Sequence, residues 1–210
     1  MSDRAPVAEI LEPLPIEVAR PLVLLRLGYR RPSQVPEKTG RLLDEILDRG
    51  RTLLEPRAVL GEFGVEAAPP DRVVLAGTLS TRSRSLCERL AGCPTAVLFA
   101  ATIGPALEDW GRTLLAEGSM TRSLLVDAYA SAAAIALGMT VEGLAARRFG
   151  ERGLAAGKRY APGYGDWDLA DQTPLCALLG IGRIGVEVTE DHLMIPAKSI
   201  SGIIGGRVAG

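Results

Sequence analysis

Apolar residues recur at helical spacing in two long stretches of the chain. In residues 37–56 they return every three to four positions, at Leu42, Leu43, Ile46, Leu47, Leu53 and Leu54. Pro56 ends this predicted helix, because proline cannot continue a helical hydrogen-bond ladder. Residues 120–149 are more uniformly apolar and rich in alanine, and they predict a long helix with an irregularity near Gly138. A further helix is expected to begin at Pro105, since proline suits the first helical position.

Shorter apolar runs bounded by glycine and proline predict strands and brief helices. The predicted strands are residues 71–81, residues 94–104 and two strands within residues 183–196 that are joined near Thr189 to Asp191. Short helices are predicted at residues 82–93, which Gly92 closes, and at residues 172–180. This order of elements predicts an α+β fold, in which strands pair across long helical insertions.

The start of the chain is punctuated by proline and differs from the rest. Residues 1–36 hold six prolines, which interrupt any long helix or strand, so we expect an N-terminal arm there. Residues 37–210 carry the periodic segments and are expected to form one body. The start lacks a basic region followed by an apolar run, so we expect no secretion signal and a cytoplasmic location.

The composition excludes several classes of partner. The chain has 24 basic and 25 acidic residues, and this balance provides no basic surface for nucleic acid or for an anionic membrane. Apolar residues make up 47% of the chain, which is enough to bury a sizeable core. Asp127 interrupts the longest apolar stretch, residues 123–139, and favours a helix buried in a soluble core over a membrane span.

Residues suited to nucleophilic catalysis or metal binding are sparse. Cys87, Cys93 and Cys176 lack the short spacing of a zinc or redox motif, and their odd number fits reduced thiols. His192 is the single histidine, so the chain has no multi-histidine metal site and no serine–histidine triad. We therefore predict neither catalytic residues nor metal ligands.

Two polar motifs have simple structural explanations. The stretch GIGRIG at residues 180–185 lies between a helix and a strand, the reverse of the order in a dinucleotide-binding turn. Asp166, Asp168 and Asp171 lack the closing glutamate of a calcium loop. We expect these three carboxylates to cap the helix that begins near Gln172.

The stretch RYAPGY at residues 159–164 concentrates unusual chemistry in a chain with only 4% aromatic residues. Arg159 offers a planar fork of donors for a carboxylate. Tyr160 and Tyr164 offer ring faces and hydroxyls, while Pro162 and Gly163 shape the turn. Such a loop could hold a small zwitterion with a planar ring, or it could form a rigid surface turn. The residues alone leave both interpretations open.

Two ordered motifs resemble the activation domain of vitamin B12-dependent methionine synthase. The first is RYAPGYGDW, and the second is IGVEVTEDHLMIPAKSISGIIG near the C-terminus. The segments LRLGYR, LLEPRAVL and LLVDAYAS further resemble small stand-alone members of the same superfamily, so the likeness spans most of the chain. The resemblance implies a single α+β domain with a twisted, mainly antiparallel sheet flanked by long helices.

The same resemblance implies a ligand and partners. Members of the family bind S-adenosylmethionine and present it to cobalamin, which a partner protein holds. A flavodoxin-like or ferredoxin-like donor supplies the electron. The resemblance places Arg159 at the methionine carboxylate, backbone groups of Ala161 and Gly163 near the adenosine or the amino group, and Tyr164 near the cobalamin face. The domain itself contributes positioning and no catalytic group.

Three departures from the family pattern bear on ligand binding. The family often has a glutamate eight residues beyond the aspartate of the long helix. Counted from Asp127, that position is Ile135 in this chain, and Glu142 lies two helical turns beyond Ile135. Ile203 and Ile204 replace family aromatic residues. The N-terminal acidic ligand has no clear counterpart among Glu9, Glu12 and Glu17.

Two hypotheses follow from the resemblance and its departures. The first is a stand-alone reactivation subunit that binds S-adenosylmethionine and serves a methionine synthase lacking its own activation domain, as an accessory component of a methyltransferase system. The alternative is a docking module that regulates a corrinoid methyltransferase without binding S-adenosylmethionine. A conventional methyltransferase is disfavoured, because the chain has no glycine-rich strand-to-helix turn of that class.

Overall fold

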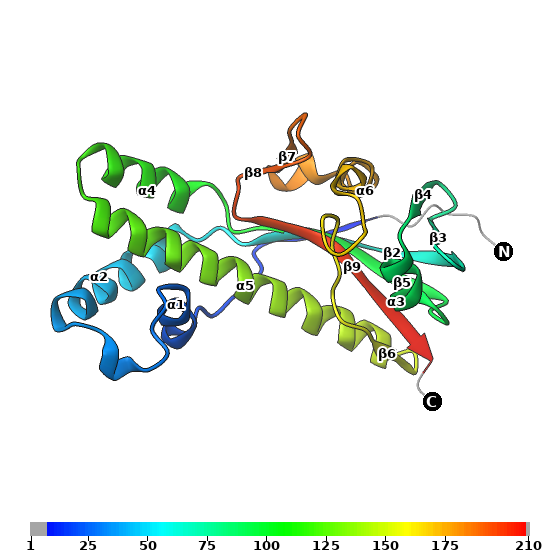
Figure 1. Cartoon of the computed structure of the whole chain (residues 1–210), viewed down its shortest axis with the longest axis horizontal. Coiled ribbons are helices and arrows are strands. Elements are labelled where there is room, and N and C mark those ends of the chain that lie inside the picture. Colours follow the sequence, from blue (N-terminus) through cyan, green and yellow to red (C-terminus); the bar gives the residue numbers. More distant parts are fainter. Residues whose placement is uncertain (1–7, 209–210) are drawn as a thin grey trace.

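The computed structural model describes residues 8–208 and contains a seven-stranded sheet in which every pairing is antiparallel (Figure 1). The strand order is β4-β3-β2-β5-β9-β6, and β1 pairs with β2. The strands are β1 (Glu9–Leu11), β2 (Arg57–Ala68), β3 (Arg72–Leu75), β4 (Leu79–Arg82), β5 (Thr95–Thr102), β6 (Leu154–Ala156) and β9 (Ser199–Val208). A separate pair joins β7 (Glu187–Val188) to β8 (Met194–Ile195). The prediction of a mainly antiparallel α+β fold is confirmed.

Residues 8–208 form six α-helices. They are α1 (Arg20–Arg26), α2 (Glu37–Leu53), α3 (Arg84–Leu90), α4 (Ala106–Ala116), α5 (Met120–Gly150) and α6 (Gln172–Leu179). Helices α3, α5 and α6 pack on the sheet, while α1, α2 and α4 pack on α5. Single turns of 3-10 helix occur at η1 (Pro32–Gln34), η2 (Leu169–Asp171) and η3 (Ile181–Ile184). The predicted helices from α2 to α6 are confirmed. Helix α5 continues unbroken through Gly138, so the expected irregularity there is wrong.

The sheet separates two hydrophobic cores. Successive side chains of a strand point to opposite faces, and on β5 Val97 and Phe99 enter one core while Leu98 enters the other. The first core lies against α5, and the second lies beneath α3, α6 and η3. All eight residues of β5 are buried, as expected for a central strand covered on both faces.

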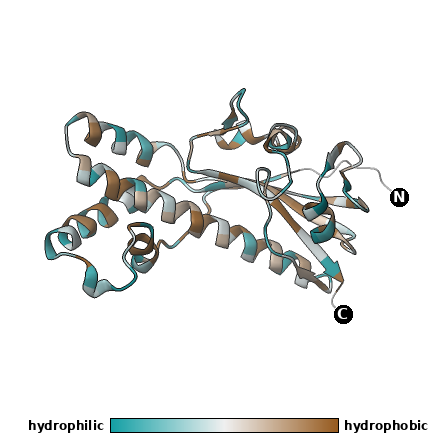
Figure 2. Cartoon of the chain, in the orientation of Figure 1, coloured by the Kyte–Doolittle hydropathy of each residue, from teal (hydrophilic) through white to brown (hydrophobic). Residues whose placement is uncertain are grey.

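Helix α5 is the longest element and joins the two halves of the molecule (Figure 1). Its first half packs with α1, α2 and α4, and its second half runs beneath the sheet toward β6. Hydrophobic residues recur along this helix (Figure 2). The helix is long and apolar enough to cross a membrane by length and composition, but most of its apolar stretch is buried inside the molecule. Small residues permit close approach: a Cβ on Gly50 of α2 would lie 2.5 Å from the Tyr129 ring.

The segment predicted as one strand at residues 71–81 is a hairpin of β3 and β4. Positive φ angles at Ala76 (55°) and Gly77 (66°) reverse the chain between them. A tight turn of this kind needs left-handed backbone, which glycine adopts at little cost. The Ala-Gly-Thr sequence carries only one strong turn residue, and this explains why the apolar pattern indicated a single strand.

The sequence patterns did not predict strands β2 and β9, which lie on either side of β5. Strand β9 contains glycines that would ordinarily weaken a strand. Here the missing side chains leave space for neighbouring residues. A Cβ on Gly205 would lie 2.9 Å from Leu90 and Cys93, and one on Gly206 would lie 2.6 Å from Phe149. The glycines of β9 therefore permit close packing on both faces of the sheet.

The segment that precedes α2 packs onto the body of the molecule. Strand β1 pairs with β2, and Leu14, Val23 and Leu24 are buried in the core that contains α5. Burying each such side chain contributes about 1.5–3 kcal/mol. The described part of the predicted arm therefore contributes to the same core as α5.

Candidate functional site

A bulge at the sheet edge begins the loop that contains the RYAPGY stretch. Residues 154–156 pair with residues 208–206 in regular register, and Tyr160 then pairs with Ile203. Three residues, 157–159, therefore stand opposite two, 204 and 205. A bulge of this kind redirects the side chains of the bulged strand. Arg159 is the last residue of the bulge, which sets the direction of its side chain.

Arg159 turns toward helix α5. Its Nε atom lies 3.5 Å from Glu142 Oε1, and the Arg159 side chain is 28% exposed. The guanidinium occupies space above Gly138, where a Cβ would overlap Nη1 and lie 2.9 Å from Cζ. Glu142, which lies two turns beyond the position of the family glutamate, is therefore the carboxylate that Arg159 contacts.

One face of α5 carries a row of mostly polar or small residues that could contact a ligand. Asp127, Ser131, Ile135, Gly138 and Glu142 are separated by three or four residues, which places them on one side of the helix. We call this row the α5 face. Arg159 lies over its C-terminal end at Gly138 and Glu142. The residue that replaces the family glutamate, Ile135, is partly exposed in the middle of the row.

Lys198 lies over the N-terminal end of the α5 face. Its Nζ atom lies 2.8 Å from Asp127 Oδ1 and donates a hydrogen bond of 2.9 Å to Ser131 Oγ. The Lys198 backbone N–H donates to Glu108 Oε1 on α4 at 2.7 Å. Seven residues separate Ser131 from Gly138, so the two cations are on the order of 10 Å apart along the helix.

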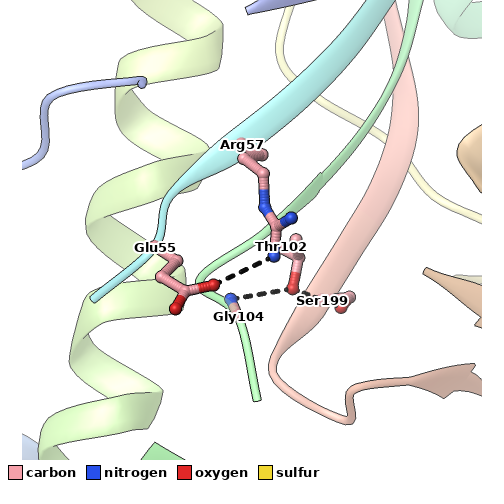
Figure 3. A network of polar contacts seen from close by, with 5 residues as sticks. All are labelled: Glu55, Arg57, Thr102, Gly104 and Ser199. Carbon is pink, nitrogen blue, oxygen red and sulfur yellow. Dashed lines mark hydrogen bonds and ion pairs between the residues drawn. The ribbon is translucent and has the colours of Figure 1, made fainter. Parts of the chain in front are cut away.

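A polar network fixes the strand ends next to Lys198 (Figure 3). The Ser199 hydroxyl donates to Thr102 Oγ1 at 3.0 Å, joining β9 to β5. Thr102 Oγ1 also accepts from the Gly104 N–H at 3.1 Å. Arg57 and Glu55 pair beside them at 3.3 Å. Because Ser199 directly follows Lys198, this network holds the backbone that presents the lysine.

Tyr160 supports the loop from inside the molecule. Its ring is buried, stacks on Trp167 with centroids 5.9 Å apart, and lies 4.3 Å from the Arg89 guanidinium. Its hydroxyl donates to the Tyr164 carbonyl oxygen at 2.7 Å and lies 2.6 Å from Ser85 Oγ. Tyr160 is therefore a structural support, not an exposed ring face for a ligand.

The turn at residues 161–167 closes on itself and leaves Tyr164 outside. The Gly163 N–H donates to the Trp167 carbonyl at 2.8 Å, and the Tyr164 N–H donates to the Ala161 carbonyl at 3.2 Å. Gly163 has a φ of 84°, a left-handed conformation that glycine adopts without strain. Tyr164 is 61% exposed and edge-on to Tyr160. The turn thus presents one aromatic ring to solvent.

Asp166 attaches the loop to α3. Its carboxylate accepts from Ser83 Oγ and the Arg84 N–H, each at 2.7 Å, from the Ser85 N–H at 3.1 Å, and from the Ser85 hydroxyl. Hydrogen bonds from the Ser85 and Ser83 hydroxyls hold the pKa of Asp166 well below its usual range. The prediction that Asp166 caps the helix near Gln172 is wrong, because the chain folds this carboxylate onto a different helix.

The other two aspartates of the loop have separate roles. Asp168 accepts from the Ala170 N–H at 2.9 Å and so caps the short turn η2, immediately before α6. Asp171 instead accepts from Trp167 Nε1 at 2.9 Å and from the Thr81 hydroxyl. Only Asp168 therefore behaves as a local cap. The described residues contain no group of three or more potential metal ligands.

The adjacent isoleucines Ile203 and Ile204 on β9 are core residues. Ile203 and Ile204 are about 1% and 0% exposed and enter opposite cores. Their difference from the family aromatic residues therefore changes packing and leaves the α5 face untouched. Cys176 is also buried, which raises the pKa of its thiol to about 12 and makes it a poor nucleophile.

Comparison with known proteins identifies the class of domain. Residues 97–209 match the family model described as vitamin B12 dependent methionine synthase, activation domain. The crystal structure of the MetH reactivation domain bound to AdoHcy has a TM-score of 0.68 and 16% sequence identity, covering 97% of this chain and 79% of that chain. No curated protein matches the sequence at a significant level. The matched range contains the α5 face, the loop and Lys198.

Proposed function

The chain belongs to the family of activation domains of vitamin B12-dependent methionine synthase, and we propose that it acts as a stand-alone reactivation subunit. It binds S-adenosylmethionine and supports reductive methylation of cob(II)alamin on a synthase that lacks its own activation domain. The family match supports this function, and the position of Arg159 over the α5 face is the observation that carries it.

Arg159 and Glu142 form a pair suited to the amino-acid end of the ligand. A guanidinium binds a carboxylate through a planar fork, and a carboxylate accepts from an ammonium group. The 3.5 Å contact between Arg159 and Glu142 is longer than a strong charged hydrogen bond. An incoming amino acid therefore replaces one loose contact with two oriented ones, its carboxylate on Arg159 and its ammonium on Glu142.

The remaining contacts of the proposed site come from the turn. Backbone groups of Ala161 and Gly163 approach the adenosine, since Gly163 has no side chain to hold it away. The exposed ring of Tyr164 lies at the surface that faces the cobalamin of the partner. Both placements follow the family resemblance and are supported by exposure of the turn.

The chemistry of the proposed reaction resides in the bound molecules. One electron from a flavodoxin-like or ferredoxin-like donor reduces cob(II)alamin to cob(I)alamin, which takes the methyl group and releases S-adenosylhomocysteine. The chain holds the methyl donor and aligns it with the partner's cofactor. This division of roles is consistent with a site that contains no activated nucleophile. We further propose that the chain and its partner meet in the cytoplasm.

Calorimetric titration of S-adenosylmethionine tests the binding site. Arg159→Ala should weaken binding by roughly tenfold or more, because a charge-assisted hydrogen bond contributes about 1.5–3 kcal/mol. Arg147→Ala is the matched control, since Arg147 is an exposed arginine on α5 that lies outside the proposed site. Equal affinity in Arg159→Ala and the unaltered chain would reject Arg159 as the carboxylate ligand.

A second experiment separates reactivation from simple docking. The cobalamin spectrum of a synthase without an activation domain is followed with reductant, S-adenosylmethionine and this chain. Return of methylcobalamin only in the presence of the chain supports the proposal. Binding to the synthase without methylation would favour the alternative docking module, for which Ile135 in place of the family glutamate is the supporting observation. Absence of binding to any cobalamin-loaded synthase would overturn both.

A further inference from the structure

A pocket separate from the α5 face lies behind the loop, on the opposite face of the sheet from α5. It has a volume of about 300 Å³ and is formed by α3, β6, the end of β9 and residues 157–160. These elements meet near the C-terminal end of β9 (Figure 1). Its apolar wall is formed by the exposed Ala155 and Ala156, and the buried side chains of Leu86, Leu90 and Ile203 lie beneath it. A volume near 300 Å³ is at the lower end of the range for small-molecule sites.

The charged residues around this pocket have a single sign. Arg89, Lys158 and Arg207 line it, and its lining in the described chain contains no aspartate or glutamate. Arg89 is held over the Tyr160 ring, and its own carbonyl oxygen accepts a hydrogen bond of 3.4 Å from Arg207 Nη2. Within residues 8–208, no ion pair engages Lys158 or Arg207.

Eleven basic side chains within residues 8–208 form ion pairs with carboxylates, but none of the three cations that line the pocket does. Three basic side chains beside an apolar wall, with no carboxylate among them, produce a positive local potential. The reason is that low-dielectric walls focus the field of the charges that line a cleft. A ligand that satisfies both features has an anionic group and a compact apolar body.

The pocket is distinct from the α5 face although both use the same segment. Lys158 and Tyr160 line the pocket, whereas Arg159 between them turns toward Gly138 and Glu142. The alternation of side chains along an extended segment explains this division. Tyr160 further connects the pocket to the turn, since its hydroxyl donates to the Tyr164 carbonyl.

From these observations we propose that the pocket binds a small organic anion, whose carboxylate or phosphate group meets Lys158 and Arg207 and whose flat apolar body lies against the exposed apolar lining at Ala155 and Ala156. The ligand contacts the Tyr160 side of the loop. Binding there therefore holds the loop in place from the face opposite to Arg159. This second site stands independently of the proposed use of S-adenosylmethionine.

Phenyl phosphate, benzoate and inorganic phosphate serve as probes, each titrated into the full chain and followed by two-dimensional NMR at low salt. We expect saturable shifts at Lys158, Tyr160 and Ile203 with phenyl phosphate or benzoate. Inorganic phosphate should bind more weakly, because it lacks the apolar body. The tighter of the two aromatic probes identifies the preferred anionic group.

Lys158→Ala and Arg207→Ala should each lower the affinity for the tighter aromatic probe roughly fivefold, as expected for loss of a partly exposed charge contact. Both side chains belong to exposed residues, so the variants are expected to fold. Arg147→Ala should leave the affinity unchanged. The proposal is overturned if binding of neither aromatic probe reaches saturation at tens of millimolar. It is also overturned if the two substitutions leave the affinity for the tighter probe unaltered. Equal affinity for inorganic phosphate would likewise overturn the role of the apolar wall.

Discussion

Gly138 offers a direct test of how the α5 face works, because stability and binding should change in opposite directions there. Gly138 lies in the interior of a 31-residue helix. Alanine is favoured over glycine in such a position by about 1 kcal/mol. By helix propensity alone, Gly138→Ala should therefore stabilise the chain.

The structure predicts a cost that propensity does not include. The alanine Cβ would overlap Arg159 Nη1 and lie 2.9 Å from Cζ, so the guanidinium must move. The side-chain end is flexible and partly exposed, and its contact with Glu142 contributes about 0–1 kcal/mol. The expected net change in the free energy of unfolding is therefore between zero and about 1 kcal/mol of stabilisation.

Binding of S-adenosylmethionine should respond differently. Displacement of the Arg159 guanidinium removes a charge-assisted contact of about 1.5–3 kcal/mol, which lowers affinity by roughly tenfold to a hundredfold. Urea denaturation measures the stability, and calorimetry measures the affinity. Gly143→Ala is the matched control, because Gly143 lies on the same helix and a Cβ added there would meet no atom within 4 Å. It should gain stability without losing affinity.

Three results would refute this reasoning. Unchanged affinity in Gly138→Ala would show that the ligand does not use Arg159 in the position seen here. A loss of more than about 1 kcal/mol in stability would show that the guanidinium cannot move aside at low cost. Parallel loss of affinity in Gly143→Ala would assign the effect to the helix as a whole.

Four further perturbations test the structural assignments. The pKa of Asp166 is lowered by its hydrogen bonds, so its stabilising effect is present above about pH 4 and is lost as pH falls further. Asp166→Asn should flatten that acid dependence in urea titrations, and an unchanged profile would contradict it. Tyr160→Phe removes the hydroxyl that bonds to the Tyr164 carbonyl and should cost about 1–2 kcal/mol in the same assay. Ile204→Ala empties a fully buried position and should cost about 2–5 kcal/mol, whereas Leu193→Ala, at an exposed position, should change stability by less than about 0.5 kcal/mol. With its pKa near 12, Cys176 should resist alkylation by iodoacetamide at pH 8 in the native chain, and rapid labelling there would contradict its burial.

The helices could be predicted from the sequence because their signals are local. The apolar positions of α2 recur at helical spacing, and Pro56 follows its end. The buried strand β5 was also recognisable, since an apolar run between Pro94 and Gly104 is typical of a strand covered on both faces. The resemblance carried by RYAPGY and the C-terminal motif identified the family, which the family model confirms.

Strands β2 and β9 escaped prediction because their stability comes from neighbours. Strand β9 is rich in glycine, which disfavours a strand when only local preference is considered. It becomes a central strand because β5 and β6 provide hydrogen bonds on both edges, while Leu90 and Phe149 fill the space above its glycines. These partners lie about 50 residues or more away along the chain.

The sequence by itself determined the helical segments, the family and the set of side chains in the loop. Tertiary structure alone decided which way those side chains point. The bulge before Tyr160 turns Arg159 onto α5 beside Glu142, and the adjoining Lys158 and Tyr160 face a different pocket. Asp166 likewise caps a helix some 80 residues earlier in the chain. The physical reason is that residue spacing fixes only local geometry, whereas register and packing between distant segments set the direction of each side chain.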